Sequence, residues 1–212
     1  MSYVLYDYLA PIYDPVFHTI YAPYRRQALE HLTLKPGDTV LDLACGTGQN
    51  FPLLAPRLTK GGTILGIDIS SGVLRRAAAY AEEQQYCGIK LLHTDATALG
   101  EGEGNLLLPG SADAVICTYG FSSMPRWKTA FDRSFTLLKP GGTYLIHDIH
   151  AKHRNPHSAF VEMVTRTDLS IPYWQALEEV SADFTLQFLP RTRLIFGGSL
   201  FIATGKKRQI IP

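Results

Sequence analysis

The sequence predicts an α/β fold in which a mostly parallel sheet is covered by helices on both faces. Seven apolar segments of strand length recur along the chain, and the first five alternate with segments of helical periodicity. Turns rich in glycine and proline separate many of these segments. The composition, with 46% hydrophobic and 18% charged residues, can bury a large core. Strands that alternate with helices are typical of parallel βαβ units.

The first 35 residues are predicted to form aromatic-rich helices interrupted by prolines, namely Pro11, Pro15 and Pro23. Six of the eleven tyrosines lie in the first 24 residues: Tyr3, Tyr6, Tyr8, Tyr13, Tyr21 and Tyr24. These side chains suit either a lid over a ligand or a helix packed on the sheet. Together with the basic neighbours Arg25 and Arg26, they also suit a membrane–water interface.

The later elements follow in a regular order. Strands are expected over residues 39–44, 63–69, 89–93, 112–118, 143–149, 183–189 and 199–204. Ser70 and Ser71 are expected to cap a helix that runs to about Gln85. Other helices are expected through Phe51, Leu54 and Leu58, from Trp127 to Leu138, and around 156–180. A short loop separates the last two strands, so we expect them to pair as an antiparallel hairpin.

Composition and charge exclude several classes of protein. Lys and Arg total 20 and Asp and Glu total 19, so the net charge of +1 lacks the basic excess of a general nucleic-acid binder. The cysteines Cys45, Cys87 and Cys117 form no C-x-x-C pair, so neither a disulfide framework nor a zinc site is expected. Without a signal-peptide pattern or a long apolar run, the chain is expected to be cytoplasmic, with contact at a membrane surface left open.

A glycine-rich loop, LDLACGTGQN over Leu41–Asn50, follows the first predicted strand. Glycines allow the backbone to approach a ligand closely, and the following helix offers unpaired amides to it. A dinucleotide fingerprint G-x-G-x-x-G would need glycine at Gln49, which argues against that class of ligand. The alternative is a tight turn between strand and helix that binds nothing.

Two acidic residues follow the next two predicted strands. Asp68 ends the second strand, 22 residues after Gly46, at the distance where a ribose hydroxyl pair is held in nucleotide-binding α/β folds. Asp95 and Ala96 follow the third strand, where a carboxylate can accept a hydrogen bond from an adenine amine. Each aspartate could instead cap a helix or turn. A fourth feature, Lys139–Gly142 (KPGG), is the turn into the fifth strand.

In this order and spacing, the four features resemble class I S-adenosylmethionine methyltransferases. Ala44 replaces the first glycine of that family's loop, which should be tolerated if its φ is negative. The opening Tyr6–Asp14 (YDYLAPIYD) is similar to the ubiquinone/menaquinone C-methyltransferase branch. The segments Thr118–Gly142 and Phe196–Lys207 look closer to small bacterial phosphatidylethanolamine and betaine-lipid N-methyltransferases.

The resemblance implies a Rossmann-like seven-stranded sheet, mostly parallel with an antiparallel C-terminal strand, helices on both faces and an N-terminal helical lid. It also implies one methyltransferase domain over residues 1–212. Within it, residues 1–35 would form the lid, residues 36–150 the cofactor-binding core, and residues 151–212 a C-terminal helix and strand hairpin.

The implied cofactor is S-adenosyl-L-methionine, and no metal is expected. The residues expected to hold the cofactor are Tyr13, Asp42, Ala44, Cys45, Gly46, Thr47, Gly48, Asn50, Asp68, Ile69, Asp95, Ala96, Thr118 and Tyr119. The residues expected to act in catalysis are Tyr13, Tyr119, His147 and Asp148. Because side chains alternate along a strand, one of His147 and Asp148 is expected to be structural. The residues expected to contact the acceptor are Tyr8, Arg126, His150 and Arg154.

The leading hypothesis is N-methylation of an amine head group, such as phosphatidylethanolamine or a betaine-lipid precursor. The first alternative is C- or O-methylation of a quinol-like or other small aromatic acceptor. The second is a cofactor-binding protein without methyl transfer. The partner is therefore expected to be a small-molecule or lipid acceptor, and the sequence does not determine the oligomeric state.

Overall fold

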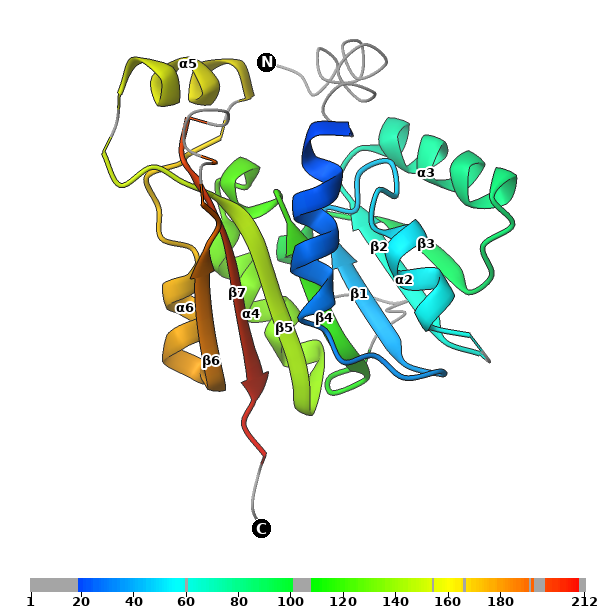
Figure 1. Cartoon of the computed structure of the whole chain (residues 1–212). Helices are drawn as coiled ribbons and strands as arrows, with labels where there is room; N and C mark the ends of the chain where they lie inside the picture. The colour runs from blue at the N-terminus through cyan, green and yellow to red at the C-terminus, as the bar shows by residue number, and fades with distance from the viewer. Residues whose placement is uncertain are drawn as a thin grey trace.

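A computed structural model describes residues 19–59, 61–100, 108–153, 155–165, 167–190, 192 and 197–209. Its centre is a seven-stranded sheet with the strand order β3-β2-β1-β4-β5-β7-β6. Figure 1 shows the parallel strands running upward, with their carboxyl ends at the top. The order reverses between β1 and β4, and in open α/β sheets ligands bind outside the carboxyl ends of the strands at such a point.

The strands confirm the predicted fold class. They are β1 (Thr39–Leu43), β2 (Thr63–Asp68), β3 (Ile89–His93), β4 (Ala112–Thr118), β5 (Leu138–His150), β6 (Ser181–Phe188) and β7 (Ser199–Lys207). The first five pair in parallel, and β7 runs antiparallel to both β5 and β6. The expected hairpin of the last two strands is therefore confirmed.

Helices cover both faces of this sheet. They are a helix over 19–30, α2 (Phe51–Leu54), α3 (Ser71–Glu83), α4 (Trp127–Leu137), α5 (Pro156–Thr165) and α6 (Trp174–Val180). Three short 3-10 turns are η1 (Ala55–Arg57), η2 (Ala96–Ala98) and η3 (Phe121–Ser123). No helix among the described residues is long and apolar enough to cross a membrane.

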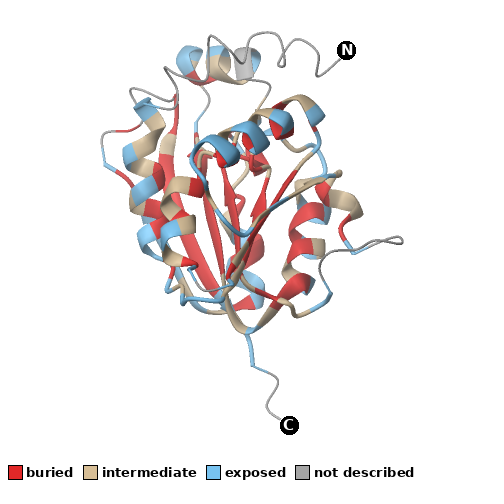
Figure 2. Cartoon of the chain, turned by 90° about the vertical axis from the view of Figure 1, so that its right-hand side faces the viewer, coloured by how far each residue is buried: buried red, intermediate tan, exposed pale blue. Residues whose placement is uncertain are grey.

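Two hydrophobic clusters show which helices pack on which face. One contains Leu29 of the first helix, Phe51 of α2 and Ala77 of α3, together with β-strand side chains. The other contains Phe131 of α4 and Leu177 of α6 with the alternate strand side chains. Figure 2 shows the buried strands between these two layers of helices. The sheet is therefore buried on both faces, which explains the apolar runs in its central strands.

Three expected boundaries are wrong. Pro23 lies within the helix over 19–30 and does not interrupt it. The fifth strand begins at Leu138, so it includes the KPGG turn that was expected to precede it. The expected helical region around 156–180 is two helices, α5 and α6, with a connection between them.

Ser70 provides a test of how local sequence sets an element boundary. Its hydroxyl accepts a hydrogen bond from the Val73 amide and caps α3. We expect Ser70→Ala to lower the free energy of unfolding by about 1 kcal/mol, because that amide loses its partner. The control is Ser71→Ala, whose exposed hydroxyl contacts only the Arg75 side chain at 3.3 Å among the hydrogen bonds seen here. Urea denaturation of both variants measures the difference; equal losses would contradict the capping role.

Candidate cofactor and acceptor site

The loop after β1 adopts left-handed backbone conformations at three positions. The φ angles are +51° at Ala44, +56° at Gly46 and +84° at Gly48. The condition under which alanine would be tolerated here, a negative φ, is therefore not met: the turn out of β1 places Ala44 in a conformation that costs alanine about 1–2 kcal/mol. A Cβ atom at Gly46 would meet nothing within 4 Å, whereas one at Gly48 would lie 2.5 Å from the Phe51 ring. Gly46 thus borders open space, and Gly48 is needed for packing.

Asp68 joins this loop to the end of β2. One carboxylate oxygen accepts a hydrogen bond from the Gly46 amide at 3.0 Å, and the other accepts one from the Ser70 amide at 2.9 Å. Ile69 follows with 43% of its side chain exposed, and the His93 ring contacts its carbonyl at 2.9 Å. Both residues lie at the carboxyl end of β2, the edge of the sheet where ligands are expected. Their roles toward ribose and adenine stay predictions.

Asp95 both caps a turn and forms an ion pair. Its Oδ1 accepts hydrogen bonds from the amide and hydroxyl of Thr97, at 2.8 and 2.7 Å, at the start of η2. Its Oδ2 lies 2.9 Å from the Arg126 guanidinium. Arg126, which was expected to contact the acceptor, therefore lies beside the residue expected to contact adenine. Ala96 is buried in η2.

Arg25 is the centre of a buried polar network that the sequence did not reveal. Its guanidinium donates to Asn50 Oδ1 at 3.1 Å, to Thr118 Oγ1 at 2.5 Å and to Gln49 Oε1 at 2.8 Å. Asn50 in turn donates to Asp42 Oδ1 at 2.9 Å. Arg25 is 8% exposed, so the suggestion that it faces a membrane–water interface is wrong. Of the two arginines, only Arg26 is exposed.

Asp42 carries a carboxylate oxygen with unmet hydrogen-bonding capacity. Its Oδ2 is buried and has no hydrogen-bond partner among the described residues. Burial raises the pKa of Asp42 to about 7, although the Asn50 hydrogen bond and the Arg25 charge oppose this shift. A carboxylate and a guanidinium bridged by one asparagine complement the ammonium and carboxylate of an amino acid. The residues present therefore fit the methionine part of S-adenosylmethionine.

Tyr119 and His147 form a hydrogen-bonded pair with a defined direction. The His147 ring is fully buried, with Nδ1 2.8 Å from the Phe201 carbonyl and Nε2 2.6 Å from the Tyr119 hydroxyl. Burial lowers the pKa of His147 to about 3, so the ring is neutral. A carbonyl only accepts, so the proton is on Nδ1 and the Tyr119 hydroxyl donates to Nε2.

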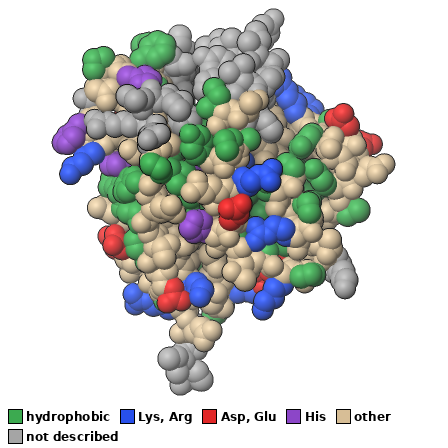
Figure 3. Space-filling model, viewed as in Figure 1, with side chains coloured by type: hydrophobic (Ala, Val, Ile, Leu, Met, Phe, Trp, Pro, Cys, Tyr) green, Lys and Arg blue, Asp and Glu red, His purple; other side chains and the backbone are tan. Residues whose placement is uncertain are grey.

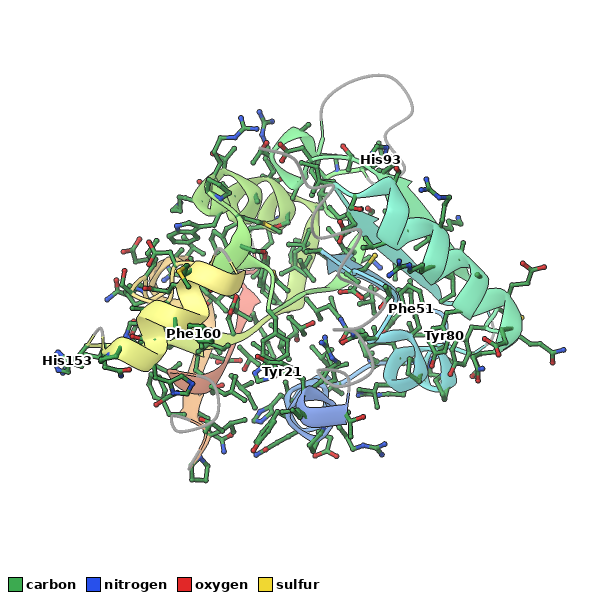
Figure 4. The ribbon with its side chains drawn as sticks, turned by 90° about the horizontal axis from the view of Figure 1, so that it is seen from above. Tyr21, Phe51, Tyr80, His93, His153 and Phe160 are labelled. Carbon is green, nitrogen blue, oxygen red and sulfur yellow. The ribbon has the colours of Figure 1, made fainter. Side chains whose placement is uncertain are left out.

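The Tyr119 side chain also contacts the first helix. Its ring makes an edge contact with Tyr21, with 4.5 Å between the ring centres, and the Arg25 guanidinium lies 5.1 Å from its centre. Tyr119 has a left-handed φ of +57°, and its amide donates to the His147 carbonyl at 2.7 Å. Seen from the carboxyl ends of the strands, Tyr21 lies near the middle of the molecule (Figure 4).

The side chains of Asp148 and His150 point away from the Tyr119–His147 pair. The buried Asp148 carboxylate accepts hydrogen bonds from the amides of Ser122 and Ile149, at 3.1 and 2.8 Å, and burial raises its pKa to about 6. It thus holds η3 on the face of β5 opposite His147, in line with the expectation that one of the two is structural. The His150 ring makes an edge contact with Trp174 of α6 at 4.8 Å. It lies toward α6, and burial lowers its pKa.

Of the remaining expected site residues, two belong to the loop after β1 and three lie outside the described residues. Cys45 is buried beneath the loop, and Thr47 is half-buried within it. The positions Tyr8, Tyr13 and Arg154 lie outside the described residues. Among the residues that the structure describes, no group of three or more His, Cys, Asp or Glu side chains could hold a metal ion.

The strand order, the loop after β1 and the acidic residue after β2 define the class I fold of S-adenosylmethionine-dependent methyltransferases. Residues 40–142 match the family model described as a methyltransferase domain, in agreement with this fold.

Sequence relatives agree with this assignment. Nocamycin O-methyltransferase of Saccharothrix syringae is 32% identical over 139 residues, covering 66% of this chain and 48% of the relative. The 2-phytyl-1,4-naphtoquinone methyltransferase of Thermosynechococcus vestitus is 30% identical over 148 residues, which cover 68% of this chain and 62% of the relative. The alignments thus span about half to three fifths of these relatives' own lengths.

Solved structures share the fold at low sequence identity. Phosphoethanolamine N-methyltransferase 2 of Haemonchus contortus, in complex with S-adenosyl-L-methionine, has a TM-score of 0.71 at 16% identity and covers 88% of this chain and 53% of its own. Geranyl diphosphate C-methyltransferase of Streptomyces coelicolor A3(2) has a TM-score of 0.74 at 12% identity, and the match covers 90% of this chain and 81% of the other. These likenesses establish the fold.

The raised pKa of Asp42 predicts a pH dependence of cofactor binding. As the pH rises toward about 7, Asp42 becomes ionised and attracts the cofactor ammonium, so affinity for S-adenosylhomocysteine should increase. Asp42→Asn should abolish this increase and weaken binding at neutral pH by roughly tenfold. Calorimetric titration at several pH values measures both effects, with the exposed Asp132→Asn as control. A wild-type affinity that is constant across this range would contradict the assignment.

Two adjacent arginines test the buried network. We expect Arg25→Ala to weaken cofactor binding by roughly tenfold or more, because it removes a charge-assisted hydrogen-bond donor beside the loop. Arg25→Lys should be intermediate, because lysine lacks the planar fork that reaches several acceptors. Arg26→Ala, at the exposed neighbouring position, should bind as the wild type does. The thermal midpoint of each variant separates loss of binding from loss of folding, and equal affinities for the two alanine variants would refute the role of Arg25.

Proposed function

We propose that this protein transfers the methyl group of S-adenosylmethionine to an amine head group, such as that of phosphatidylethanolamine or a betaine-lipid precursor. The observation that carries the proposal is the Tyr119–His147 pair, which lies next to Thr118 and the Arg25 network. The match of residues 40–142 to a methyltransferase domain supports the class of reaction. The N-terminal part, residues 1–35, acts in this proposal as a lid over the cofactor, fastened by Arg25.

The bound cofactor supplies an electrophilic methyl group on a positively charged sulfur, so the protein has mainly to align a nucleophile and exclude water. Tyr119 donates its only hydroxyl proton to His147, which leaves oxygen lone pairs that accept a hydrogen bond from the acceptor. An N–H or O–H held in this way directs the nucleophile's own lone pair toward the methyl group. His147 stays neutral and keeps the hydroxyl in this orientation.

The surroundings of Tyr119 also keep an amine reactive. The half-buried position of Tyr119 and the positive charge of Arg25 both disfavour an ammonium ion, and only the neutral amine has a lone pair. The rings of Tyr21 and Tyr119 meet edge to face and offer an aromatic wall to the methylated product. Tyr13 and Asp148 remain in the proposal, Tyr13 as a lid contact and Asp148 as the group that holds η3 in place.

A second candidate is C- or O-methylation of a quinol-like or other hydroxyl-bearing aromatic acceptor. A neutral acceptor of this kind avoids placing a second cation near Arg25, whose guanidinium is 5.1 Å from the Tyr119 ring centre. Relatives named for O-methylation and for naphthoquinone methylation favour it as well.

An acceptor screen distinguishes these proposals. The purified protein is incubated with S-adenosylmethionine and phosphatidylethanolamine, small amines, or a naphthoquinol, and products are measured by mass spectrometry. Methylated amine lipid supports the leading proposal, and methylated quinol supports the second. Cofactor binding without a product from any acceptor in the panel would point to a cofactor-binding protein that transfers no methyl group.

Removal of one hydroxyl tests the mechanism. We expect Tyr119→Phe to lower kcat by roughly a hundredfold, because the acceptor loses the hydrogen bond that orients its nucleophile. Cofactor affinity should change little, because the ring and its contact with Arg25 remain. The control is Tyr80→Phe on α3, which removes a hydroxyl remote from Tyr119. If Tyr119→Phe retains the wild-type kcat, the proposed role of the pair is wrong.

A further inference from the structure

Asp95 and Arg126 form an ion pair at the carboxyl edge of the sheet. Asp95 follows β3, and the preceding Thr94 donates its amide to the Asp68 carbonyl at 3.1 Å, so the end of β3 adjoins the end of β2. Arg126 comes from the connection between β4 and α4, and its Nη2 lies 2.9 Å from Asp95 Oδ2. The pair is therefore placed at the strand ends that adjoin Asp68, the residue expected to hold the ribose.

Most of the accepting capacity of the Asp95 carboxylate is already used. Burial opposes its ionisation, but the Thr97 hydrogen bonds and the Arg126 charge hold the pKa of Asp95 below its ordinary value, so the group is ionised and only accepts. A carboxylate has about four lone-pair sites. The Thr97 amide and hydroxyl bind Oδ1, at 2.8 and 2.7 Å, and Arg126 binds Oδ2. With the described residues as partners, one site on Oδ2 is left to accept a hydrogen bond from a ligand.

The Arg126 guanidinium has donors to spare beside that oxygen. A guanidinium carries five N–H groups in a planar fork. The contact with Asp95 is the one hydrogen bond that the Arg126 side chain makes to another residue in the described part of the chain. Because this side chain is 68% exposed, its other N–H groups are accessible to a ligand.

Both members of the pair are held by their own surroundings. Arg126 directly precedes α4, and the next residue, Trp127, packs edge to face on Tyr173 with 5.0 Å between the ring centres. Asp95 is fixed by its two hydrogen bonds from Thr97. Each side chain therefore extends from a fixed backbone position, which reduces the entropy cost that usually weakens an exposed ion pair.

An accepting oxygen beside a donating N–H is the arrangement that an asparagine amide presents. Such an amide pairs with adenine, because it accepts from the exocyclic amine and donates to the ring nitrogen beside it. We propose that Asp95 and Arg126 together recognise the adenine of the cofactor in this way: Asp95 Oδ2 accepts from the amine, and Arg126 donates to the neighbouring ring nitrogen. The inference rests on the cofactor of the proposed function and is independent of the acceptor. It assigns Arg126 to the cofactor, whereas the sequence predicted a contact with the acceptor.

A general attraction between charges does not explain this role. Figure 3 shows basic and acidic side chains interspersed over the face in view, and the net charge of the chain is +1. S-adenosylhomocysteine carries an ammonium and a carboxylate of opposite charge, so a single distant positive charge on the protein attracts it little. A loss of affinity for this ligand on removal of Arg126 would therefore indicate a direct contact.

Calorimetric titration of the full chain tests the contact. The ligands are S-adenosylhomocysteine and its 1-deaza and 7-deaza adenine analogues, each of which has C–H in place of one ring nitrogen beside the amine. We expect the wild type to bind one analogue about tenfold more weakly than the parent ligand, because the hydrogen bond from Arg126 is lost. Arg126→Ala should bind the parent about tenfold more weakly and should no longer distinguish it from that analogue. Arg126→Lys, which lacks the planar fork, should be intermediate.

The matched control is Lys128→Ala. Lys128 is also exposed near the start of α4 and forms an ion pair, but its partner is Asp132 on the same helix. This variant should bind all three ligands as the wild type does. Exposed ion pairs contribute little to stability, so the thermal midpoints of all the variants should stay close to that of the wild type.

Four results would overturn the inference. The wild type could bind the parent and both analogues equally, or Arg126→Ala could bind the parent as the wild type does. Arg126→Ala could also weaken the binding of all three ligands by the same factor, which would indicate a purely structural role. If the wild type bound none of them, the cofactor assignment would fail as well. Because no acceptor is present, the result does not depend on methyl transfer.

Discussion

A buried guanidinium must find hydrogen-bond partners for its N–H groups, and the arrangement of the site depends on how Arg25 finds them. Its partners lie on the loop after β1 and at the end of β4, whereas Arg25 itself belongs to the helix over 19–30. Three segments distant in sequence are thereby held in one geometry. Asn50 extends the network to Asp42, so the positive and negative groups are separated by a single amide. The first helix is therefore part of the site and more than a cover for the sheet.

The need of buried polar groups for hydrogen-bond partners also determines the geometry of the acceptor side. His147 is buried on β5, and the Phe201 carbonyl on the antiparallel strand β7 determines which of its nitrogens carries the proton. That choice determines the direction of the hydrogen bond from Tyr119. The C-terminal hairpin, which contributes none of the residues expected to bind cofactor, thus controls the orientation of a hydroxyl beside Arg25.

Two of the four non-glycine residues with a left-handed φ among the described residues lie at the point where the strand order reverses. Ala44 follows β1 and Tyr119 follows β4, and each has a left-handed φ although it is not glycine. Such conformations cost about 1–2 kcal/mol each and persist where surrounding contacts enforce them. A Cβ atom at Gly120 would lie 3.0 Å from the Ala44 Cβ, so the two strained turns pack directly against each other. Close packing of these turns brings the loop, Arg25 and Tyr119 into one site.

The sequence by itself determined the order of strands and helices, the antiparallel hairpin, the Ser70 cap and the glycine loop, because each depends on neighbouring residues or short spacings. It also indicated that His147 and Asp148 face opposite sides. Only the tertiary structure decided which of the two lies beside Tyr119, that Arg126 pairs with Asp95, and that Arg25 is buried. Arg25 and Thr118 are 93 residues apart, and no local pattern records which distant groups will satisfy a buried charge.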